Sequence, residues 1–150
     1  MDKLIEELKN DHLMIFRLLS GLGGLADNPG SVRKLLLSAR KRIMEHFRKE
    51  DKKLYPALRK ASGRNKRLKE KLDKLADEMS STTEELDKFF KKYSKSGPRG
   101  NFIGELNAIY RLVKERLQKE ELYIFTEYTE YKGISKSQAE SSHLPSSTLL

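Results

Sequence analysis

Hydrophobic residues recur at every third or fourth position along most of this chain, and that spacing is typical of amphipathic helices. One such stretch covers Asp2–Ser20, and a second runs to Gly63 from Ser31, a residue that can cap a helix. A third stretch covers about Lys66–Tyr93, and a fourth covers Asn101–Lys132. Four amphipathic helices joined by short polar loops predict an all-α fold, an antiparallel up-down-up-down four-helix bundle.

Glycine and proline predict where the helical pattern is interrupted. The glycines of residues 21–24, followed by Asn28–Gly30, are expected to end the first helix. Pro56 falls inside the second periodic stretch and lacks the N–H that would bond back to Lys52. We therefore expect a kink at Pro56, or the end of the regular helix.

The last part of the chain differs from the rest. Residues 133–150 are rich in serine, include His143 and show no sustained hydrophobic period. We therefore assign residues 1–132 to the bundle and expect residues 133–150 to form a flexible tail without a core of its own.

Five polar residues occupy positions in the hydrophobic stripes where apolar side chains are expected. His12 lies in the first stripe, and His46 and Glu50 lie one helical turn apart in the second. Arg116 and Glu120 repeat this spacing in the fourth stripe. An unpaired carboxylate is costly to bury, so a metal ion or a buried cation is expected beside these acids.

The second and fourth helices share a local sequence plan, because residues 46–56 align with residues 116–126 without a gap. The matched positions are His46 with Arg116, Phe47 with Leu117, Lys49 with Lys119, Glu50 with Glu120, Asp51 with Glu121, and Leu54–Tyr55 with Ile124–Phe125. If the two helices pack in register, the two inward acids come close together across the bundle.

These motifs resemble those of the hemerythrin-like family, helical bundles with HHE cation-binding motifs. The resemblance covers about residues 1–130. It is carried by Asp11–His12, by the stretch His46–Pro56, and by Glu120–Glu121 with Ile124–Phe125. It implies a hemerythrin-like bundle, non-haem iron binding, and the binding or sensing of dioxygen or nitric oxide, or the storage of iron.

The chain departs from the family's full ligand set, which holds two irons. It has three histidines, and one of them is His143 in the expected tail. Met79, after Glu78, stands where the family has a third-helix histidine, Arg116 stands where it has a fourth-helix histidine, and Thr126 replaces a proline. The candidate metal ligands that the resemblance leaves are His12, His46, Glu50 and Glu120, with Glu121 as a substitute for Glu120 if the helix is rotated.

Two interpretations of this incomplete set remain. In the first, the four candidates hold a single iron, zinc or manganese ion, with water at the open positions, and the ion binds a small ligand such as dioxygen or nitric oxide. In the second, no metal is bound. Arg116 cannot ligate a cation, but it can pair with Glu50 or Glu120, while Met79 fills the remaining gap. We expect at most one metal ion in either case.

The net charge of +9 adds an alternative function. Positive residues are concentrated in Arg33–Lys74, so a metal-free bundle could dock an acidic protein partner or nucleic acid through its basic helices. Acidic residues are mixed into the same region, and no stacking aromatic residues or known docking motif accompany the charge. Nucleic acid is therefore the less favoured partner.

Several functions are excluded or disfavoured by composition. The chain has no cysteine, which rules out disulfides, thiolate metal sites and cysteine nucleophiles. It has no Gly-rich phosphate loop and no Ser-His-acid set on one helix face, so we do not expect an enzyme. No apolar run is long enough to span a bilayer and no signal peptide is evident, so we expect a cytoplasmic protein that does not enter membranes.

Overall fold

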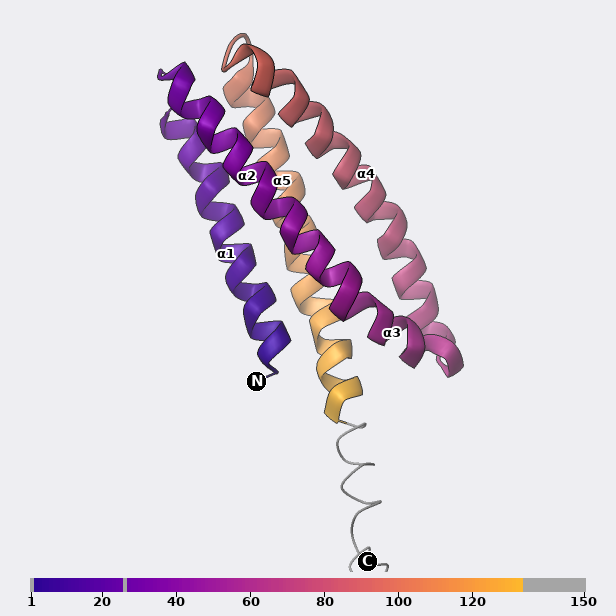
Figure 1. Cartoon of the computed structure of the whole chain (residues 1–150). Coiled ribbons are helices and arrows are strands. Elements are labelled where there is room, and N and C mark those ends of the chain that lie inside the picture. Colours follow the sequence, from indigo (N-terminus) through magenta and orange to yellow (C-terminus); the bar gives the residue numbers. More distant parts are fainter. Residues whose placement is uncertain (1, 26, 134–150) are drawn as a thin grey trace, which may run out of the picture.

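The computed structural model describes residues 2–25 and 27–133, and every structural statement below concerns these residues. They form long antiparallel helices packed side by side (Figure 1). In chain order the elements are α1 (Lys3–Gly24), α2 (Pro29–Lys49), a first π turn (Glu50–Leu54), α3 (Tyr55–Ala61), a 3-10 turn (Ser62–Arg64), α4 (Lys66–Ser96), α5 (Phe102–Lys119) and a second π turn (Glu120–Ile124). Residues 125–133 continue as α-helix.

The predicted architecture is confirmed. α1 packs against α2 and α5, and α4 packs against the same two helices, which gives an antiparallel up-down-up-down bundle. Of the expected tail, only Gly133 is described, and it is helical; the rest, including His143, lies outside the described residues. In the part of the chain that the structure describes, no helix has both the length and the apolarity needed to cross a membrane.

The first helix is longer than expected, because residues 21–24 continue α1 instead of breaking it. Leu22 lies among these glycines and is fully buried, and its burial offsets the cost of roughly 1 kcal/mol that a glycine adds within a helix. Gly21 also allows close packing, since a Cβ there would lie 3.3 Å from Leu35 Cδ2. The prediction of a break was wrong because it weighed local propensity without this tertiary packing.

The cap of the second helix also differs from the prediction. Asn28, and not Ser31, is the N-cap, and its Oδ1 accepts a hydrogen bond of 3.2 Å from the Ser31 N–H. Pro29 follows as the first helical residue, where its missing N–H costs nothing. α4 extends three residues beyond the predicted Tyr93 and ends at Ser96. Gly97 follows as the cap residue, and its φ of 70° favours glycine.

Two π turns interrupt the helices that carry the repeated motif. The Tyr55 N–H bonds to the Glu50 carbonyl, and the Phe125 N–H bonds to the Glu120 carbonyl, each five residues back. The expected irregularity near Pro56 is therefore present, but as a π turn that begins at Glu50. The second π turn forms with Thr126 at the matching position, so a proline is not the shared cause. Each π turn begins at a buried glutamate, and π segments frequently mark functional sites.

The core has two apolar halves. The larger half includes Ile15, Ile43 and Leu117, and the smaller half includes Leu8, Leu54 and Ile124. Along three of the helices, charged or imidazole side chains are buried between members of the two halves: His12 in α1, His46 and Glu50 at the end of α2, and Arg116 and Glu120 at the end of α5. We call these five residues the polar layer.

Candidate metal centre

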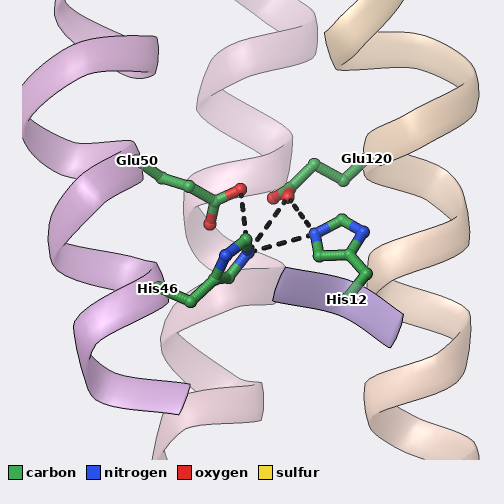
Figure 2. Close-up of side chains that lie close together, drawn as sticks. All are labelled: His12, His46, Glu50 and Glu120. Atoms are coloured by element: carbon green, nitrogen blue, oxygen red, sulfur yellow. Dashed lines mark hydrogen bonds and ion pairs between the residues drawn. The ribbon is translucent and has the colours of Figure 1, made fainter. Parts of the chain in front are cut away.

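The polar layer brings together the four residues that the sequence marks as candidate ligands. Figure 2 shows His12, His46, Glu50 and Glu120 pointing toward one another from three helices. One ligand atom from each of the four lies within 4.8 Å of the others. All four side chains are buried, with exposed fractions of 2% or less.

The two imidazoles meet at their Nε2 atoms, which are 3.0 Å apart. Oε1 of Glu120 lies 3.2 Å from Nε2 of His12 and 3.8 Å from Nε2 of His46. Oε2 of Glu50 approaches Nε2 of His46 at 3.4 Å. The two acids of the repeated motif therefore face one site across the bundle, as the in-register alignment of the two helices predicted.

The outer nitrogens of both imidazoles are held by carboxylates. Nδ1 of His46 lies 3.1 Å from Oδ2 of Asp11, and that oxygen also accepts a hydrogen bond of 2.9 Å from Nζ of Lys49. Nδ1 of His12 lies 3.3 Å from Oε1 of Glu121. A carboxylate at Nδ1 favours the tautomer that carries its proton there, which leaves the Nε2 lone pair free to bind a metal.

This arrangement needs a positive charge at its centre. With the Nδ1 atoms protonated, two Nε2 lone pairs and a carboxylate oxygen converge within hydrogen-bond distance. A metal ion at about 2.0–2.1 Å from each nitrogen would hold neighbouring ligand atoms roughly 3–3.4 Å apart. The observed separations of 3.0 and 3.2 Å fall in that range.

Without an ion, protons must supply the charge, and the pKa values reflect this. Burial lowers the pKa of His46, but the neighbouring carboxylates of Glu120, Glu50 and Asp11 outweigh burial and raise it to about 10. Burial raises the pKa of Glu50 well above its usual range, and the neighbouring Glu120 raises it further. Burial also acts to raise the pKa of Glu120, yet Glu50, His12 and His46 stabilise its charged form and hold its pKa well below the usual range.

Glu50 is the least satisfied member of the polar layer. Neither of its carboxylate oxygens has a hydrogen-bond partner among the described residues, although the side chain is fully buried. Buried polar atoms in proteins are nearly always paired, and leaving a carboxyl group unpaired is costly. A bound cation would satisfy these oxygens, so the donor set fits a metal ion.

Arg116 lies inside the bundle, as its position in the hydrophobic stripe predicted, with 4% of its surface exposed. Its Nη2 is 3.7 Å from Oε2 of Glu120 and donates a hydrogen bond of 3.2 Å to the Tyr55 hydroxyl. Its Nη1 donates to the Leu75 carbonyl at 3.3 Å. The guanidinium is thus a counter-charge for Glu120. It approaches the carboxylate with Nη2 alone and does not form the bidentate pair that its geometry allows.

Sequence reasoning missed Tyr55, whose hydroxyl donates a hydrogen bond of 2.9 Å to Oε2 of Glu120. A regular α-helical repeat places residue 55 away from the face that carries Glu50, whereas the wider π turn brings it inward. The alignment of Tyr55 with Phe125 in the repeated motif was the available signal, because Phe125 also reaches the site and stacks on His12 with ring centroids 5.4 Å apart.

Glu121 has a different place from the one expected. It is partly exposed and contacts the outer nitrogen of His12, so it does not substitute for Glu120 at the centre. Met79 is half-buried and lines a hollow beside Arg116. The sequence marked Asp11 only as part of a motif. In the structure its carboxylate contacts Nδ1 of His46.

The fold and this layer define a class of protein: a helical bundle with an inward-facing site of imidazoles and carboxylates. A family profile described as the hemerythrin HHE cation binding domain matches residues 3–128. The chain belongs to this family, and the resemblance seen in its motifs is confirmed. Searches of the curated proteins and of the solved structures gave no significant match.

Proposed function

We propose that this protein binds one non-haem iron ion through His12, His46, Glu50 and Glu120 and uses it to sense dioxygen or nitric oxide. One observation carries the proposal: two buried Nε2 atoms face each other at 3.0 Å while carboxylates hold both Nδ1 atoms. Two imidazoles with two carboxylates suit iron(II), and they also suit zinc or manganese. Iron would supply affinity for small diatomic ligands.

The residues around the centre support a site for one ion. Arg116 places a fixed positive charge beside Glu120, where a second cation would be repelled. Apolar core lies on both sides of the polar layer and keeps bulk water away. A hollow of about 100 Å³ between α1 and α2 reaches His46 and offers a small ligand a route from the surface.

Metal analysis of protein purified after growth with added iron tests this function. We expect close to one metal ion per chain in the native protein and almost none in His46→Ala, because that substitution removes a ligand. Glu45→Ala is the matched control, since Glu45 is exposed and precedes His46 on the same helix. Equally low metal in the native protein and in His46→Ala would refute the proposal.

The competing function is a metal-free module that docks an acidic protein partner, and exposed basic side chains on α2 and α4 support it. Four of the exposed residues are Lys41, Arg42, Lys66 and Arg67. Binding through such a surface weakens steeply with salt, and most steeply when the partner is nucleic acid. Partner binding that is steeply salt-dependent and unchanged in His46→Ala would favour this function.

A further inference from the structure

Tyr55 follows the first π turn and reaches the metal centre, although it is not itself a candidate ligand. Its hydroxyl donates a hydrogen bond of 2.9 Å to Oε2 of Glu120, which belongs to the last helix. The π turn Glu50–Leu54 is wider than an α-helical turn and rotates residue 55 toward the inside of the bundle. A residue of the second helix therefore acts on a carboxylate of the fourth.

The direction of this hydrogen bond is set by Arg116. Nη2 of Arg116 lies 3.2 Å from the Tyr55 hydroxyl oxygen, and a guanidinium can only donate. Arg116 is itself fixed by a hydrogen bond of 3.3 Å from Nη1 to the Leu75 carbonyl. The hydroxyl oxygen of Tyr55 therefore accepts from Arg116, which leaves the hydroxyl hydrogen for Glu120.

The two oxygens of Glu120 consequently have different surroundings. Oε1 faces the imidazoles, at 3.2 Å from Nε2 of His12 and 3.8 Å from Nε2 of His46 (Figure 2). Oε2 accepts the hydrogen bond from Tyr55 and lies 3.7 Å from Nη2 of Arg116. Rotation of the carboxylate to bring Oε2 to a bound ion would break the hydrogen bond from Tyr55, which is costly inside a protein. Glu120 is therefore arranged to offer an ion Oε1 alone.

Glu50, which matches Glu120 in the repeated motif, has no such restraint. Phe125 stands at the position that matches Tyr55, has no hydroxyl, and stacks on His12 with ring centroids 5.4 Å apart. Neither oxygen of Glu50 has a hydrogen-bond partner among the described residues. The two carboxylates are thus unequal, because one is held and the other can turn.

We propose that Tyr55 is a positioning residue that makes the centre selective among divalent metals. It holds Glu120 to one oxygen, so that Glu50 is the carboxylate that adapts to the ion. Imidazole ligands suit zinc and iron(II), whereas manganese(II) prefers additional oxygen ligands. Withholding one oxygen therefore favours zinc and iron(II) over manganese(II). The inference rests on the proposed metal centre and adds to it the choice of metal.

The test compares the affinities of the full-length protein for zinc and for manganese(II), each measured by competition with a chelator. In Tyr55→Phe the second oxygen of Glu120 is released and can become a ligand. We expect the ratio of zinc affinity to manganese affinity to fall in this variant. Loss of a merely structural hydrogen bond would weaken the binding of both metals together and leave the ratio unchanged.

Tyr93→Phe is the matched control, because Tyr93 is also a buried tyrosine that donates a hydrogen bond to a glutamate, Glu105. Tyr93 belongs to the larger apolar half and not to the polar layer. We expect Tyr93→Phe to keep the native ratio of affinities.

Crystal structures of the manganese-loaded native protein and of manganese-loaded Tyr55→Phe provide a second measurement. We expect Oε1 alone of Glu120 within bonding distance of the ion in the native protein, and both oxygens within that distance in Tyr55→Phe. The native structure tests the inference even if Tyr55→Phe does not fold.

Three outcomes would overturn the inference and leave the metal centre standing: an unchanged affinity ratio in Tyr55→Phe, an equal fall in Tyr93→Phe, or both oxygens of Glu120 bound to the ion in the native protein. If the native protein binds neither zinc nor manganese, the proposed function is refuted and the inference with it.

Discussion

At the scale of single residues, the site depends on which nitrogen of each imidazole faces inward. Asp11 and Glu121 bind the outer nitrogens, so His12 and His46 present Nε2 to the same point. The inward direction of the two histidines could be predicted from helical spacing alone. The tautomers could not, because they are set by residues whose contacts form only when the helices pack.

Glu120 and Glu121 make a matched pair for testing this arrangement. Glu120→Gln should abolish metal binding, because it removes a charged candidate ligand. Glu121→Gln should weaken metal affinity by about 10–100-fold, the usual cost of losing a partner of a ligating histidine. Competition with a chelator measures both affinities, and equal losses in the two variants would contradict the assigned roles.

Arg116 offers the opposite test, because it stands where the family resemblance places a histidine. Arg116→His removes the fixed positive charge and adds a group that can ligate. We expect more metal bound per chain than in the native protein, measured by elemental analysis. Unchanged metal content would show that Arg116 does not occupy a ligand's place.

At the scale of elements, the hydrophobic period predicted the helices and most of their inward faces. The hydrophobic period did not predict the two π turns, because it assumes the α-helical repeat along the whole stretch and does not detect a single wider turn. It also could not show that residues 21–24 remain helical, since that depends on the burial of Leu22 against other helices.

Replacing glycine by alanine should have opposite effects on stability at the end of α1 and just after α4. Gly24→Ala should raise the free energy of unfolding by about 0.5–1 kcal/mol, because Gly24 is helical and its Cβ would meet no atom within 4 Å. Gly97→Ala should lower it by about 1 kcal/mol, because Gly97 has a positive φ of 70°. Urea unfolding measures both, and effects of the same sign would contradict this account.

Glu127 ties residues 125–133 to α4 through Lys71 at 3.0 Å and Arg67 at 2.9 Å. Burial acts to raise the pKa of Glu127, but these hydrogen bonds outweigh burial and lower it. A lowered pKa means that the stabilisation is present above the ordinary pKa of glutamate, 4.5, and is lost as the pH falls through the folded value.

Unfolding measured from neutral to acid pH should therefore show a smaller loss of stability in Glu127→Gln than in the native protein. Glu130→Gln is a suitable control, because Glu130 is exposed three residues further along. An identical pH dependence in the native protein and Glu127→Gln would show that these ion pairs contribute nothing.

At the scale of the whole molecule, the chain is a bundle whose two apolar halves meet at a charged layer. Family membership could be expected from the motifs, and the profile match over residues 3–128 confirms it. The hollow beside Arg116 had no sequence signal, because it arises from three segments that are distant in the chain.

If the polar layer holds a metal ion, removal of that ion should lower the stability of the whole bundle. A ligand that binds only the folded state raises the stability by an amount set by its concentration and affinity. Treatment with a chelator should therefore lower the melting temperature of the native protein and leave that of His46→Ala unchanged. A melting temperature that the chelator does not alter in the native protein would contradict metal binding in the polar layer.

The position of the charged layer also determines how the bundle tolerates an empty centre. Each apolar half is packed by residues of its own, so neither depends on the ion for cohesion. Because the two halves are packed separately, we expect local opening at the charged layer to leave both ends of the bundle packed. If an ion is bound there, its exchange would then require local opening and not unfolding of the whole bundle.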